Sequence, residues 1–165
     1  MEASGGAERS VIIKLLAVGT RMPSWVEEAF SDYAKRLPKN FQLQLVEIAA
    51  EKRRNVSADT ARKAEAERIL AKVSTTDTLV MLDETGTGFG TVAFANKLKN
   101  WQEAGSSPVL LIGGADGLHQ RCRERANLVM QVSDLTLPHG MVRVVLAEQV
   151  YRAWSLLNHH PYHRA

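Results

Sequence analysis

The sequence contains a single cysteine and no long apolar run. With Cys122 as the one thiol among 165 residues, no disulfide can form within the chain. We expect a reducing compartment and no catalytic role for this thiol. No apolar stretch approaches the roughly 20 residues that a membrane-spanning helix requires, and the first ten residues lack the apolar centre of a secretory signal. These absences predict a cytoplasmic protein without a membrane anchor.

Common nucleotide-binding and metal-binding motifs are also missing. No G-x-x-x-x-G-K-[ST] occurs, and "GTGFG" (86–90) lacks the Rossmann spacing and follows two acidic residues, a poor setting for a pyrophosphate. His159, His160 and His163 have no His or Cys pair elsewhere that would complete a metal site. We therefore expect no metal and no phosphate clamp.

What is present is typical of one α/β domain. Hydrophobic residues make up 45% of the chain, and its length suits a single core. Apolar runs rich in β-forming residues alternate with helical patterns, which predicts a mostly parallel sheet with helices on both faces. We expect a flexible extension over residues 1–10 and one domain over 11–165. Strands are expected over 11–19, 41–48, 77–84, 107–114 and 127–138, and helices over 23–37, 57–73, 92–102, 118–126 and 140–157.

The charge balance leans basic. A net charge of +3 and a pI of about 9.2 permit an RNA partner without requiring one. The basic stretches "EKRR" (51–54) and "QRCRER" (120–125) are candidates for such a contact, and ordinary solvated charge is the alternative.

Three loops follow predicted strands and contain glycine or proline. They are "LDETGTGFG" (82–90), "LIGGADG" (111–117) and "SDLTLPHG" (133–140). Ligands of parallel sheets bind outside the carboxyl ends of the strands, and glycine lets the backbone approach a ligand closely. Convergence of these loops would make a pocket of backbone and apolar groups, although tight turns would also explain the glycines.

The last third of the sequence closely resembles a known family. "LLIGGADGL" (110–118) is followed by "LTLPHGMVRVVLAEQVYRAWSLLNHHPYHR" (135–164), and "LLAVGTRMPSWVEEAFSDYAKRLP" (15–38) and "VMLDETG" (80–86) match as well. On these segments the chain resembles the ribosomal RNA large subunit methyltransferase H family of the SPOUT superfamily, over roughly residues 11–165.

The resemblance implies a fold, an assembly and a reaction. Members of the family have a parallel sheet with a deep C-terminal trefoil knot and work as homodimers. They methylate N3 of a pseudouridine in helix 69 of 23S rRNA on the 70S ribosome, with S-adenosylmethionine as methyl donor. A ribosome-binding protein without catalysis and a tRNA methyltransferase are the alternatives that the resemblance leaves open.

The resemblance also implies site residues. Loss of the N3 proton requires a general base or cationic groups that stabilise the deprotonated ring. His163 is the candidate base, Tyr162 could stack on a nucleobase and Arg164 could bind phosphate. Glu148 and Arg152 lie four residues apart, where a surface ion pair is the alternative. The implied cofactor-binding set is Leu82, Gly113, Gly114, Ser133, Asp134, Leu135, Thr136, Leu137 and Pro138, the catalytic set is His163, Arg152, Glu148 and Tyr162, and the RNA-binding set is Arg143 and Arg164.

Overall fold

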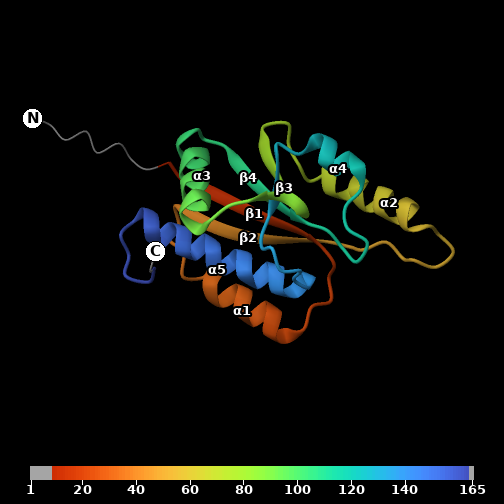
Figure 1. The fold of residues 1–165 in the computed structure, drawn as a ribbon, viewed down its shortest axis with the longest axis horizontal. Helices are drawn as coiled ribbons and strands as arrows, with labels where there is room; N and C mark the ends of the chain where they lie inside the picture. The colour runs from red at the N-terminus through yellow and green to blue at the C-terminus, as the bar shows by residue number, and fades with distance from the viewer. Residues whose placement is uncertain (1–8, 164–165) are drawn as a thin grey trace, which may run out of the picture.

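The computed structural model describes residues 9–163 and contains one parallel sheet of order β2-β1-β4-β3-β5 (Figure 1). The two expected features that involve residues 1–8 and Arg164 lie outside the described residues. The elements in chain order are β1 (Val11–Val18), α1 (Ser24–Ala34), β2 (Phe41–Ile48), α2 (Ala58–Leu70), β3 (Asp77–Gly88), α3 (Thr91–Glu103), β4 (Ser107–Ile112), α4 (Gln120–Arg125), β5 (Leu128–Gln131) and α5 (His139–Leu157).

Helices cover both faces of the sheet. Because successive strand side chains point to opposite faces, Leu15 of β1 packs with Phe30 of α1 and Phe94 of α3, whereas the adjacent Leu16 packs with Ile69 of α2. Helices α1, α3 and α5 therefore lie on one face and α2 and α4 on the other (Figure 1). This arrangement confirms the predicted α/β class with a parallel sheet, and the trefoil knot stays a prediction.

Strand β3 is longer than predicted because it contains a bulge. Leu82 and Thr87 both pair with Met130 of β5, so residues 83–86 lie outside the ladder. A Cβ on Gly86 would lie 2.7 Å from the backbone nitrogen of Met130, so the close approach of the two strands requires glycine there. The expected end of this strand at residue 84 was wrong for that reason, and the bulge carries Asp83 and Glu84 out of the β3–β5 ladder.

Strand β5 is shorter than predicted. It ends at Gln131, whose side-chain amide donates to the carbonyl oxygen of Ser133 at 2.7 Å, and Ser133 Oγ accepts from the backbone nitrogen of Leu135 at 2.9 Å. These local side-chain bonds compete with a strand ladder. Residues 132–138 consequently form a loop that leads through Pro138 into α5.

Candidate functional site

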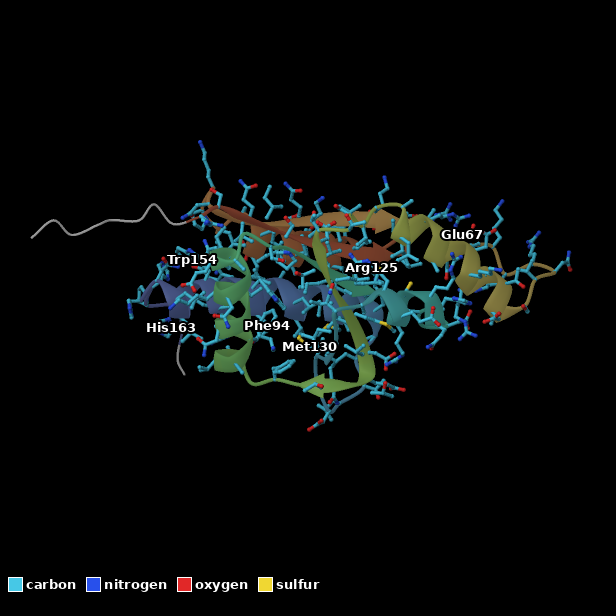
Figure 2. All side chains as sticks on the ribbon, turned by 90° about the horizontal axis from the view of Figure 1, so that it is seen from above. Glu67, Phe94, Arg125, Met130, Trp154 and His163 are labelled. Atoms are coloured by element: carbon cyan, nitrogen blue, oxygen red, sulfur yellow. The ribbon has the colours of Figure 1, made fainter. Side chains whose placement is uncertain are left out.

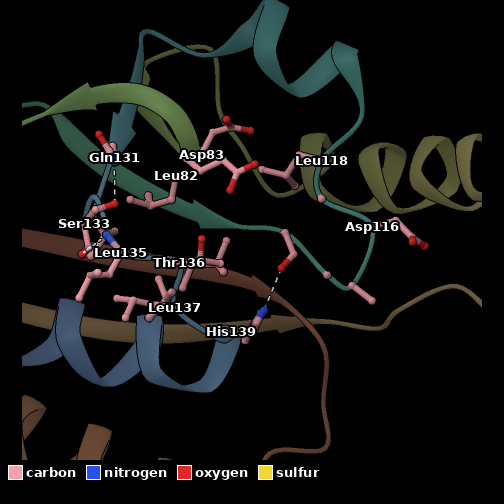
Figure 3. Close-up of a pocket in the computed structure, with 18 of the residues that line it drawn as sticks. Leu82, Asp83, Asp116, Leu118, Gln131, Ser133, Leu135, Thr136, Leu137 and His139 are labelled. Atoms are coloured by element: carbon pink, nitrogen blue, oxygen red, sulfur yellow. Dashed lines mark hydrogen bonds between the residues drawn. The ribbon is translucent and has the colours of Figure 1, made fainter.

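A cavity of about 580 Å³ opens where the bulge in β3 and the loops after β4 and β5 meet (Figure 3). It lies at the carboxyl ends of the strands, as expected for an open parallel sheet. Asp134 and Pro138 of the predicted cofactor-binding set do not line it; Asp134 is exposed and accepts from the Gln131 amide at 3.1 Å. The seven predicted residues that line the cavity are Leu82, Gly113, Gly114, Ser133, Leu135, Thr136 and Leu137.

The cavity has an apolar side and an acidic side. Leu82, Leu137 and Val142 supply apolar wall, and Asp83 and Glu84 from the β3 bulge supply carboxylates. Burial alone would raise the pKa of Asp83, but hydrogen bonds from Thr85 and the charge of Arg123 outweigh it and hold this pKa below its usual range. The cavity therefore presents the fixed negative charge of Asp83 beside hydrophobic surface, and Arg62 of α2 adds a positive charge to its lining.

Several lining residues were missed by the sequence prediction. Those with polar or charged side chains include Arg62, Asp83, Glu84, Gln131 and His139. The two acids directly follow a buried strand and His139 directly follows "LTLP", so both signals were visible in the sequence. Their positions depend on the bulge in β3 and on the start of α5, which propensity patterns do not specify.

The glycine-rich loop after β4 is a tight turn. The backbone nitrogen of Gly117 donates to the carbonyl oxygen of Gly114 at 3.1 Å, and Gly117 has φ +77°. A Cβ on Gly113 would lie 2.9 Å from the carbonyl carbon of Gly117 and 2.8 Å from Leu118. The turn therefore requires glycine at position 113 and favours it at position 117. A tight turn is thus sufficient to explain both glycines. The same turn also forms part of the cavity wall.

An ion-pair network joins this turn to the basic loop over residues 51–55. Arg53 Nε donates to Asp116 of the turn at 2.7 Å, and the same guanidinium lies 3.2 Å from Glu65, which is 2% exposed. Glu65 also accepts from the backbone nitrogen of Glu51 at 2.9 Å. Arg53 thus has a structural role beside the cavity, whereas the exposed neighbours Lys52 and Arg54 have no bonded partner among the described residues.

Three of the four predicted catalytic residues, Glu148, Arg152 and Tyr162, contact one another beside the C-terminal half of α5, and His163 follows Tyr162 in the chain. Glu148 accepts from Arg152 Nε at 2.8 Å and from the Tyr162 hydroxyl at 3.1 Å. The Arg152 guanidinium carbon lies 5.3 Å from the centre of the Tyr162 ring. Burial, a hydrogen bond with Tyr33 and the Glu148 charge raise the pKa of Tyr162. Glu148 and Arg152 therefore belong to a partly buried network rather than to an isolated surface pair.

Contacts around His163 determine which ring nitrogen carries the proton. Ser155 Oγ donates its one hydrogen to the carbonyl oxygen of His160 at 2.9 Å. The His163 Nδ1 atom, 2.8 Å from the same hydroxyl, must therefore be the donor of their hydrogen bond. Neutral His163 consequently keeps its lone pair on Nε2, the atom with no protein partner among the described residues.

The cavity and the catalytic cluster lie along different parts of α5. The cavity is lined by His139 and Val142 in the first turns, whereas Arg152 lies ten residues beyond Val142, which corresponds to about 15 Å along a helix axis. Figure 2 shows His163 at one end of the molecule and Met130 of β5, the neighbour of the cavity-lining Gln131, nearer its middle. One chain therefore does not bring the predicted cofactor-binding residues and the predicted catalytic residues together.

Arg143, predicted to bind RNA, is buried in this structure. Its side chain is 1% exposed and donates to the Gly19 carbonyl oxygen at 2.8 Å, to Glu47 at 2.9 Å and to His139 Nε2 at 2.9 Å. All three guanidinium nitrogens donate hydrogen bonds within the protein, so this arginine has a structural role. The predicted phosphate contact of Arg164 concerns a residue outside the described range.

Residues 9–163 include one cysteine and no cluster of metal-ligand side chains. Within this range no three His, Cys, Asp or Glu side chains are grouped so that they could hold a metal ion. Cys122 is buried, and burial raises the pKa of its thiol to about 11. No helix of the described part is long and apolar enough to cross a membrane.

Comparisons with known proteins agree on one family. A family model described as "Predicted SPOUT methyltransferase" matches residues 11–163. Proteins named ribosomal RNA large subunit methyltransferase H are 51% identical in Chromobacterium violaceum and 53% identical in Laribacter hongkongensis, each over 92% of this chain and 98% of the relative. Solved methylase family proteins share the fold alone: one from Neisseria gonorrhoeae has a TM-score of 0.55 at 11% identity, over 99% of this chain and 100% of that protein, and one from Haemophilus influenzae has 0.54 at 13%, over 93% and 70%.

Proposed function

The chain belongs to the SPOUT methyltransferase family, and on that premise we propose that it is an S-adenosylmethionine-dependent methyltransferase of 23S rRNA. Its target in this proposal is N3 of a pseudouridine in helix 69 of the assembled 70S ribosome. The observation that carries the proposal is the convergence of the β3 bulge and the loops after β4 and β5 on one cavity, in a chain about half identical over nearly its whole length to proteins named for this reaction class. A ribosomal substrate also implies a cytoplasmic location.

The cavity fits the chemistry of the methyl donor. Its volume lies within the roughly 300–1,000 Å³ of small-molecule sites. When bound, S-adenosylmethionine supplies a methyl group activated by a positively charged sulfur. Leu82 and Leu137 would contact its apolar parts, and the carboxylates of Asp83 and Glu84 complement its positive charge. Methyl transfer from this sulfur is an in-line displacement, so the main contribution of the protein is to position the reactants.

The cluster of Glu148, Arg152, Tyr162 and His163 fits the binding and deprotonation of the RNA base. His163 Nε2 has a free lone pair that can accept the N3 proton. Arg152, oriented by Glu148, would stabilise the negative charge that develops on the ring. Tyr162, whose ring packs against Tyr151 and Arg152, would stack on a nucleobase in this proposal. Each of these roles depends on named atoms that the α5 packing and the tail bonds hold in place.

A homodimer would unite the two halves of the site. Val142 of the cavity wall and Arg152 of the cluster are ten residues apart along α5, or about 15 Å, and on this separation we infer that one chain does not apply both to the same nucleotide. In a two-fold dimer the tail of one protomer can approach the cavity of the other, since an isologous interface pairs each surface with its counterpart. We therefore propose two composite sites for each dimer.

The proposal is tested by transfer of a labelled methyl group from S-adenosylmethionine. Intact unmodified 70S ribosomes, separate subunits, naked 23S rRNA and tRNA are compared, and the modified nucleotide is mapped by mass spectrometry. We expect label in 70S particles alone, on one pseudouridine. Label on tRNA would replace the substrate in this proposal, and absence of cofactor binding would favour a ribosome-binding protein without catalysis.

A further inference from the structure

His139 joins the wall of the cavity to the buried Arg143. Its Nδ1 lies 2.8 Å from the carbonyl oxygen of Gly113, and its Nε2 lies 2.9 Å from Arg143 Nε. The ring lines the cavity, and the dashed line in Figure 3 marks its bond to the turn after β4. It is the one histidine among the cavity-lining residues.

The two partners permit only one protonation state. A carbonyl oxygen accepts hydrogen bonds, so Nδ1 must carry a hydrogen, and Arg143 Nε donates, so Nε2 must keep its lone pair. A protonated ring would place an N–H against the N–H of Arg143 and a second positive charge beside a buried cation. Burial and the Arg143 charge lower the pKa of His139, against the opposing effects of the Gly113 carbonyl and Glu47.

Arg143 is itself fixed by two other strand ends. It donates to Glu47 near the end of β2 and to the carbonyl oxygen of Gly19 after β1. Through His139 this network also reaches Gly113 after β4. Three neighbouring strand ends are thus tied to the first turns of α5, and the bond to Gly113 is the one that acts directly on the cavity wall.

We propose that His139 is a positioning residue whose neutral Nδ1–H form holds the 113–117 turn in the shape that binds the methyl donor. The inference rests on the proposed function and deepens it. Gly113 has no side chain and its carbonyl is held by His139, so the orientation of this peptide depends on the imidazole. Protonation of the ring breaks the bond to Arg143 and adds a positive charge next to a cavity that must accept a positively charged sulfur.

The test measures the affinity for S-adenosylmethionine by calorimetry between pH 5 and 8, in wild type, His139→Gln and His139→Leu. The charged groups facing the ring are Arg143 on α5 and Glu47 on β2, while Gly113 after β4 contributes a carbonyl. Wild-type affinity should fall as the pH drops through the lowered pKa of His139, by up to about tenfold for each pH unit below it.

A glutamine amide can donate to Gly113 and accept from Arg143 without titrating, so His139→Gln should retain binding and lose this pH dependence. His139→Leu should bind at least about tenfold more weakly at every pH.

Controls separate positioning from a loss of folding. His159→Asn changes an exposed histidine with φ +54°, a conformation that asparagine also adopts, and should keep the wild-type profile. The unfolded chain protonates His139 more readily than the folded one, so stability falls as the pH drops below about 6.5, and circular dichroism must show each sample folded. Superimposed profiles for wild type and His139→Gln, with unchanged affinity in His139→Leu, would overturn the inference. Failure of wild type to bind the cofactor at pH 8 would instead overturn the proposed function.

Discussion

Gly113→Ala should weaken the binding of S-adenosylmethionine by about 10- to 100-fold. The added methyl group would lie 2.9 Å from the carbonyl carbon of Gly117 and 2.8 Å from Leu118, so the turn that forms the cavity wall must move. Overpacking of this kind costs about 1–3 kcal/mol, and each 1.4 kcal/mol is a factor of about ten in affinity. Titration calorimetry at pH 8 measures the effect.

A matched glycine variant distinguishes this effect from a general loss of stability. A Cβ on Gly90 would meet no atom within 4 Å, and Gly90 does not line the cavity. Gly90→Ala should therefore bind the cofactor like wild type. Equal affinity in Gly113→Ala and wild type, with both folded by circular dichroism, would remove the turn from the cofactor site.

Arg152→Ala should lower kcat for methyl transfer by about 100- to 1,000-fold and leave the affinity for the cofactor unchanged. Loss of one group that stabilises developing negative charge in a transition state has an effect of about this size. Arg152 is far from the cavity along α5, so binding of the methyl donor to the free enzyme should not depend on it. Single-turnover transfer to 70S ribosomes and calorimetry together measure the two quantities.

An ion pair with the same spacing elsewhere provides the control. Lys99 and Glu103 on α3 lie 3.9 Å apart, four residues apart in sequence, and both are exposed. Such a pair contributes about 0.3–0.5 kcal/mol, so Lys99→Ala should transfer methyl groups at nearly the wild-type rate. A similar small loss in Arg152→Ala would return the Glu148–Arg152 pair to the role of a surface ion pair.

The position of the cavity could be predicted from the sequence because parallel strands end at the same sheet edge. Leu82, Gly113 and Ser133 each follow a recognisable apolar run, and they do line one cavity. The contribution of Asp83 and Glu84 could not be predicted, since it depends on a bulge that forms where Gly86 meets the backbone of Met130. Strand propensity describes one strand, whereas a bulge is a property of a pair.

The roles of charged residues were harder to predict than their locations. Arg143 looks like any helical arginine in the sequence, and only the packing of α5 against β1 and β2 buries it with Glu47 and Gly19. Glu148 and Arg152 show the spacing of an ordinary helical pair, and the tail that adds Tyr162 folds back by tertiary contacts. Burial of a charge is decided by neighbouring elements, which a local pattern does not contain.

The measurement that tests the composite site most directly is methyl transfer by two purified heterodimers. In the first, one protomer carries Gly113→Ala and the other Arg152→Ala; in the second, one protomer carries both changes and the other is wild type. If each site takes its cavity from one protomer and its tail from the other, the first heterodimer keeps one intact site in two and should show roughly half of the wild-type activity, and the second should be nearly inactive. The reverse result, an inactive first heterodimer and a half-active second one, would contradict this account.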